Sequence, residues 1–125
     1  MDPFPSAQPS PDVLPCSTGP AVRITTVVAG RAVLVVVEGE CDLAAAPVLE
    51  AAAAALPLGV LSVALDLSGL EFLDWTGLES LLALARPGVT PVLLDPSRAV
   101  RCLLDAVAST GLVPEGLRVL STRGT

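Results

Sequence analysis

The feature that most constrains the fold is a nearly continuous apolar run at residues 33–37, inside a β-branched segment at residues 32–38. Such a run indicates a strand covered on both faces, as in the sheet of an α/β protein. A second β-branched segment at residues 22–29 precedes it. The glycine-containing turn Gly30-Arg31 between the two segments predicts an antiparallel hairpin.

After this hairpin, helical and strand patterns alternate along the chain. Pro47 suits the first turn of a helix whose apolar residues recur at helical spacing until Pro57 ends it. A third helix is capped by Asp95-Pro96-Ser97 and stops at Gly111. The other expected elements are strands at 60–67, 89–94 and 117–120, and a second helix at 76–85 closed by Arg86-Pro87-Gly88.

This order of elements defines a fold class. Alternating strands and helices predict an α/β protein with a mixed, mostly parallel sheet of four or five strands and about three helices, preceded by the N-terminal β-hairpin. A chain of 125 residues suits one such domain, which we place at residues 21–125. Residues 1–20 hold six of the twelve prolines, so we expect them to form a disordered tail.

Charge and composition exclude several functions. The net charge is −6, with no lysine, so phosphate backbones and anionic lipid surfaces would repel the chain, and its partner should be a protein. With no histidine, the chain lacks a serine or cysteine catalytic triad and a histidine general base, and we expect no enzyme activity, cofactor or metal centre. Three scattered cysteines indicate reduced thiols in a cytoplasmic protein, and a link between Cys41 and Cys102 is the alternative.

No segment of the sequence predicts a signal peptide or a membrane span. The first twelve residues lack a basic region followed by an apolar region. The longest apolar run, at residues 48–65, is interrupted by Glu50, Pro57 and Gly59, which a helix, a turn and a strand explain better than a spanning helix.

The most informative stretch is residues 64–82, where a buried strand ends near Leu67 and a helix begins at Thr76. This places Asp74, Trp75 and Thr76 beyond the carboxyl end of a strand, where open α/β sheets bind ligands. Thr76 and Glu79 have the spacing of a capping box, in which the threonine oxygen accepts a bond from the Glu79 N–H. Ser68 fits a turn residue better than a modification site.

Three motifs in order resemble the STAS domains, the family of anti-sigma-factor antagonists and their relatives. They are Asp66-Leu-Ser-Gly-Leu-Glu-Phe-Leu-Asp-Trp-Thr-Gly-Leu78, Gly39-Glu-Cys-Asp-Leu43 followed by Ala46-Pro47, and Leu94-Asp-Pro-Ser97 with Thr110-Gly-Leu112. The resemblance runs from about residue 22 to residue 120. It implies partner switching, in which the unmodified antagonist binds a serine-kinase-type anti-sigma factor and the phosphorylated form releases it.

This chain departs from the family pattern at the phosphorylated position. The residue after the motif aspartate is commonly serine in the family, and here it is Trp75, which has no hydroxyl. Thr76 is therefore the candidate phospho-acceptor. Its alternative role is that of a helix cap. The second helix is also short for the family and lacks the usual basic tail. Both departures leave open a STAS subunit of another assembly, such as a lipid-transport complex or a multi-STAS signalling particle, without a phosphorylation cycle.

The candidate partner-binding residues surround this position, and each has a structural alternative. Trp75 is either an interface anchor or a filler between helix and sheet. Asp42 and Asp74 are predicted to form an acidic surface for a partner or to bind the magnesium ion of the partner's nucleotide. Their structural alternative is the capping of helices and turns. Gly77 permits close approach of a backbone. The predicted partner-binding set is Asp42, Asp74, Trp75, Thr76, Gly77 and Leu78, in a monomer or weak homodimer.

Overall fold

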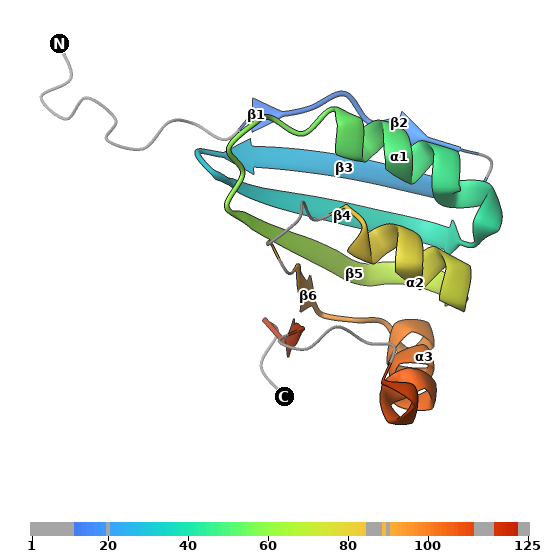
Figure 1. Ribbon diagram of the computed structural model, residues 1–125. Coiled ribbons are helices and arrows are strands. Elements are labelled where there is room, and N and C mark those ends of the chain that lie inside the picture. Colours follow the sequence, from blue (N-terminus) through green and yellow to red (C-terminus); the bar gives the residue numbers. More distant parts are fainter. Residues whose placement is uncertain (1–11, 20, 85–88, 90, 112–116, 123–125) are drawn as a thin grey trace, which may run out of the picture.

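The computed structural model describes residues 12–19, 21–84, 89, 91–111 and 117–122. In this part of the chain, seven strands form one sheet in the order β1-β3-β4-β5-β6-β7, with β2 also paired to β3 (Figure 1). The elements are β1 (Asp12–Val13), β2 (Ser17–Thr18), β3 (Val22–Ala29), β4 (Ala32–Cys41), η1 (Leu43–Ala45), α1 (Ala46–Ala54), β5 (Ser62–Leu73), α2 (Trp75–Leu82), β6 (Val92–Leu94), α3 (Arg98–Val107), η2 (Ala108–Thr110) and β7 (Arg118–Leu120).

The predicted hairpin is present. Strands β3 and β4 pair antiparallel from Val22↔Gly39 to Ala29↔Ala32, and Gly30 takes a positive φ of 62° in the turn, where glycine is favoured. Strands β4, β5, β6 and β7 then pair parallel to one another. The predicted fold class, a mixed and mostly parallel sheet with three α-helices after a hairpin, is confirmed.

Part of the expected tail belongs to the sheet. β1 and β2 both pair antiparallel with β3, at Asp12↔Val28 and at Ser17↔Ile24. Residues 12–18 thus lie along the outer edge of β3, which differs from the expectation of disorder for residues 1–20. Residues 1–11 and 20 lie outside the described residues.

Strand β5 is longer than the sequence indicated. It continues past Leu67 to Leu73, so the expected turn around Ser68 is wrong. Register shifts between Val36↔Asp66 and Glu38↔Gly69, and again after Gly39↔Leu70, show that β5 carries extra residues relative to β4. Such bulges bend a strand without ending it. At the first bulge, the Ser68 N–H and Oγ both donate to Asp66 Oδ1, at 3.0 and 2.7 Å.

The helices begin close to where the sequence placed them. α1 has Pro47 in its first turn, and the Ser97 side chain caps α3 by accepting from the Val100 N–H. Gly111 follows η2 with a positive φ of 75°, as expected of a helix stop. α2 begins one residue before the expected Thr76, and its predicted closure at Arg86-Pro87-Gly88 lies outside the described residues.

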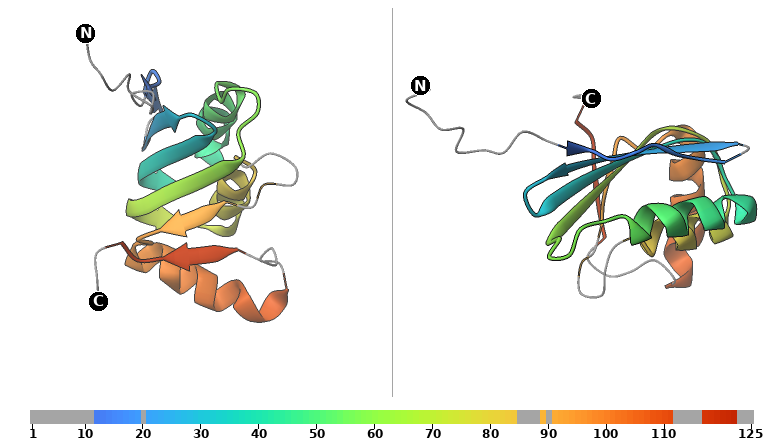
Figure 2. Two further views of the ribbon diagram at one scale, coloured as in Figure 1. Left: turned by 90° about the vertical axis from the view of Figure 1, so that its left-hand side faces the viewer. Right: turned by 90° about the horizontal axis from the view of Figure 1, so that it is seen from above.

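The core lies between one face of the sheet and helices α1 and α2 (Figure 2). Alternate residues of β3, β4 and β5 are buried on this face, and α3 runs along the edge formed by β6 and β7. In the two views of Figure 2, no described helix lies over the middle of the opposite face. The expectation that β4 is covered on both faces is therefore wrong, because Leu34 and Val36 are half-buried on a face without a helical layer. We call this the open face.

Candidate functional site

The candidate site is where β4 and β5 end side by side, at the right-hand end of the sheet in Figure 1. Cys41 pairs with Leu73, and the Asp74 N–H donates to the Cys41 carbonyl at 3.4 Å. Each strand then leads directly into a helix, β4 into η1 and β5 into α2. We call the exposed and half-buried residues of these two connections the rim: Glu40, Asp42, Leu43, Glu71, Phe72, Asp74, Trp75, Thr76 and Glu79.

The two motif aspartates cap these helices. Asp42 Oδ1 accepts from the Ala44 N–H at 2.9 Å, and Asp74 Oδ1 accepts from the Gly77 N–H at 2.7 Å. Both residues have extended backbone, which is usual for an N-cap. Each cap holds one carboxylate at a fixed place on the rim, so the predicted acidic pair is brought together at one end of the sheet.

The expected capping box at Thr76 is wrong. The N-cap of α2 is Asp74, and Thr76 lies within the first turn of the helix. Its carbonyl oxygen accepts from Ser80 Oγ at 3.0 Å, whereas its hydroxyl makes no hydrogen bond to any of the described residues. The hydroxyl of this half-buried residue is thus not needed to begin the helix.

Two of the predicted partner-binding residues are buried. A Cβ on Gly77 would lie 2.2 Å from the Cys41 carbonyl oxygen and 2.9 Å from Leu73 Cδ1, so glycine here lets α2 touch the end of β4. Leu78 is fully buried in the core. Gly77 and Leu78 therefore shape the rim from beneath, and the expectation that Leu78 contacts a partner is wrong.

Trp75 has features of both of its predicted roles, as an interface anchor and as a filler between helix and sheet. It is the first residue of α2, and its half-buried side chain packs against the core. The remaining exposed part of the indole belongs to the rim. Tryptophan in such a position contributes to folding through one edge and is available for contact through the other.

Two apolar residues of the rim were not singled out from the sequence. Leu43, directly after the Asp42 cap, is 70% exposed, and Phe72, near the end of β5, is 47% exposed. Phe72 lies between the buried residues Leu70 and Leu73 and pairs with Glu40 just beyond the second register shift. This shift turns the Phe72 side chain away from the core. An apolar residue placed immediately after a capping aspartate is the signal that could have identified Leu43.

The rim is acidic. Residues 40–43 and 71–79 include Glu40, Asp42, Glu71, Asp74 and Glu79, and no arginine. Exposed apolar side chains among carboxylates form a surface that favours a basic and apolar partner, because complementary charge steers the encounter while apolar contacts add affinity.

Cys41 lies beneath the rim and is fully buried. Burial first, and then the nearby carboxylates of Asp74 and Asp42, together raise the pKa of the Cys41 thiol to about 12. Its Sγ donates to the Gly77 carbonyl oxygen at 3.8 Å. A neutral, buried thiol is a poor nucleophile, so Cys41 is a structural residue of the rim.

The described residues hold no group of three or more cysteine, aspartate or glutamate side chains placed to bind a metal ion. The hydrogen bonds of Asp42 and Asp74 give these two residues the role of helix caps. All three cysteines are free, including Cys41 and Cys102. None of the described helices has the length and apolar character needed to cross a membrane.

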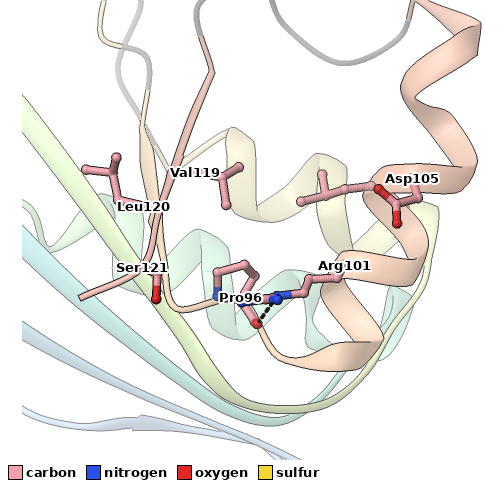
Figure 3. Close-up of a pocket in the computed structure, with 7 residues that line it drawn as sticks. Pro96, Arg101, Asp105, Val119, Leu120 and Ser121 are labelled. Carbon is pink, nitrogen blue, oxygen red and sulfur yellow. Dashed lines mark hydrogen bonds between the residues drawn. The ribbon is translucent and has the colours of Figure 1, made fainter. Parts of the chain in front are cut away.

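A hollow of about 510 Å³ lies away from the rim, between α3 and β7 (Figure 3). Arg101 reaches into it and donates from Nε to the Pro96 carbonyl oxygen at 3.1 Å, while Asp105 lies at its lip. None of the predicted site residues lines this hollow.

No protein-family model and no curated protein matches the chain. Among solved structures, the chain is similar to the crystal structure of an antisigma-factor antagonist, a STAS domain from Rhodobacter sphaeroides. The two are 19% identical with a TM-score of 0.49, and the similarity covers 66% of this chain and 99% of that chain.

Proposed function

We propose that this chain is a non-catalytic regulatory module of the STAS type that acts as an anti-sigma-factor antagonist in the cytoplasm. The observation that carries this proposal is the rim itself. The two motif aspartates cap neighbouring helices at one end of the sheet, and half-buried or exposed apolar residues stand beside them. This is a surface for a protein partner, and we identify that partner as a serine-kinase-type anti-sigma factor from the motifs that the sequence shares with the family.

Apolar rim residues supply the affinity in this proposal. Leu43 and Phe72 are exposed, and Trp75 is half-buried against the core. Residues of this kind dominate protein interfaces when a partner removes them from water. Asp42 and Asp74 orient a basic partner surface, and their caps keep the two connections fixed before the partner arrives.

Phospho-control acts at Thr76 in this proposal. Because Asp74 caps α2, the Thr76 hydroxyl is available for modification without loss of the cap. A phosphate there would lie in the first turn of a helix, where the dipole and free N–H groups favour an anion. It would also add about −1.5 to −2 charges to an already acidic rim and so weaken docking on the partner.

A binding experiment with matched leucine variants tests the docking surface. Leu43 on the rim is 70% exposed, and Leu58, which precedes β5 at the other end of the sheet, is 91% exposed. We expect Leu43→Ala to weaken binding of the host's anti-sigma kinase by about tenfold, as for a moderate interface residue, and Leu58→Ala to leave it unchanged. Calorimetric titration measures both. Equal effects of the two substitutions would place the interface elsewhere.

A phosphorylation experiment separates the two forms of the proposal. The protein is incubated with ATP and a kinase that binds it, and intact-mass spectrometry detects an added phosphoryl group. We expect one group that is lost in Thr76→Ala and retained in Thr25→Ala, whose half-buried hydroxyl lies on the open face. Binding without any modification favours the second candidate, a STAS subunit of another assembly without a phosphorylation cycle, which the absence of a hydroxyl at Trp75 already supports.

A further inference from the structure

The open face of the sheet carries an apolar row that no described element covers. Residues paired side by side in a sheet point to the same face, and the register joins Val13, Val27, Leu34, Ala64 and Val92 across five strands. Four of these side chains are half-buried, and Val13 at the β1 end is 67% exposed. The row crosses the whole sheet at right angles to the strands.

All residues of the row except Val13 line a hollow of about 560 Å³. Besides the row, its walls are formed by small or apolar residues of neighbouring positions: Ala29, Ala32, Val33, Ser62, Val63, Leu94 and Leu120. Among the described residues, none that lines it is charged. An apolar hollow of this size is filled by a few side chains on an extended segment.

The chain itself has such a segment attached at one end of the row. Residues 1–11 join β1 at Asp12, which pairs with Val28 and is followed by Val13 of the row. Eleven residues span about 34 Å in an extended proline-rich conformation. Continued to Arg118 on β7, which pairs with Val92, the row spans six strands, or about 24 Å at the usual strand spacing, so the segment is long enough to cover it.

The composition of residues 1–11 matches the hollow. They include four prolines, which bring no N–H group to be desolvated, and the apolar side chains Met1 and Phe4. Their one charged residue is Asp2, near the far end of the segment.

We infer that residues 1–11 dock along this apolar row of the open face, with Phe4 in the hollow, and so form the layer that the sheet lacks on that side. Attachment at Asp12 gives the segment an effective concentration in the millimolar range, so weak contacts suffice. A second copy of the chain fits less well, because two hollowed faces leave a void between them and both copies carry a net charge of −6.

Disulfide trapping in the full chain tests this inference. In a background of Cys16→Ser and Cys102→Ser, Ala7→Cys is combined with Ala64→Cys or Ala32→Cys on the open face, or with Ala54→Cys on α1 as a matched control. Ala32 and Ala64 both line the hollow, whereas Ala54 is exposed on the opposite side of the sheet. Two open-face positions are used so that the test still holds if one of the two variants fails to fold.

We expect the link within one chain to form roughly tenfold faster with Cys at 64 or 32 than at 54, because docking raises the local concentration at the open face. Phe4→Ser should remove most of this difference. Equal rates at the two faces overturn the inference. Disulfide formation between two chains through position 64, at a rate that rises with protein concentration, also overturns it and identifies a second copy as the occupant.

Discussion

The two connections of the rim use the same local device with different outcomes. In both, a strand ends, an aspartate accepts a hydrogen bond from an N–H of the first turn, and an apolar residue comes next. After β4, that residue is Leu43, which is 70% exposed. After β5, it is Trp75, which is half-buried and packs against the core.

The difference follows from what each helix touches. η1 is a single turn of three residues that leads directly into α1, and only its last residue, Ala45, is buried. α2 has eight residues and is held against Cys41 at Gly77, with Leu78 and Leu81 buried beneath it. A cap therefore fixes where a helix begins, while the packing behind it decides how far the first apolar residue is exposed. Predictions at Cys41, at two glycines and at the cap of α2 test whether packing holds the two connections together, beginning with the largest expected effect.

The first prediction concerns Cys41, which lies between the two connections. In the native protein, we expect its thiol to react with a thiol reagent at least about a hundredfold more slowly than exposed Cys16 and Cys102, because reaction needs local unfolding. Timed labelling followed by mass spectrometry of the cysteine peptides measures the three rates. Similar rates for all three thiols would mean that α2 does not close over β4.

The same thiol gives a pH dependence of known sign. Its pKa is raised from 9.0 to about 12 in the folded state, so the stability it contributes is complete below about pH 9 and is lost as the pH rises toward 12. We expect the melting temperature to fall more steeply between about pH 9 and about pH 12 in the native protein than in Cys41→Ala. Parallel slopes would contradict the buried position of the thiol.

The second prediction compares two glycines. A Cβ on Gly77 would meet the backbone of Cys41 at 2.2 Å, whereas the atom nearest to a Cβ on Gly69 would be Glu38 Cγ, in a flexible side chain, at 3.0 Å. We expect Gly77→Ala to lower the free energy of unfolding by about 3 kcal/mol, as overpacking does. Gly69→Ala should cost about 1 kcal/mol or less, the cost of turning one exposed side chain.

Urea denaturation measures both glycine variants. Equal small losses would show that α2 can move away from β4 without cost, and that the two connections are not held together through Gly77.

The third and smallest prediction concerns the cap of α2. Asp74→Ala should lower the free energy of unfolding by about 1 kcal/mol, because the Gly77 N–H loses its acceptor, and Asp74→Asn should retain most of the stability. Thr76→Ala should change it by about 0.5 kcal/mol or less. Denaturant titration of the three variants decides the matter. A larger loss of stability in Thr76→Ala than in Asp74→Ala would show that Thr76, and not Asp74, caps α2.

Much of the fold could be predicted from local patterns. The β-branched runs and Gly30 define the hairpin, Pro47 and Ser97 mark two helix starts, and Gly111 marks a helix stop. These features depend on the backbone preferences of single residues and on side-chain periodicity, which act within a few positions along the chain. The motif around Asp74 likewise located the rim, because residues at the end of a parallel strand share one edge of the sheet.

The errors occurred where distant segments compete with local preference. Ser68-Gly69 has the composition of a turn, yet β5 continues to Leu73 because pairing with β4 accepts extra residues as bulges. Thr76 has the spacing of a cap, yet Asp74 takes the Gly77 N–H because the end of β5 places it first. Leu78 is the last residue of the motif and still faces the core.

The sequence by itself determined the order of strands and helices, the acidity of the rim and the absence of a hydroxyl at Trp75, since these follow from residue identity and short-range preferences. Only the tertiary structure decided that Asp74 is the cap, that Leu43 and Phe72 are exposed, and that none of the described helices covers the middle of the open face. The physical reason is that burial and hydrogen-bond partners depend on which segments meet in space, and β4 meets β5 and α2 through contacts between residues thirty or more positions apart.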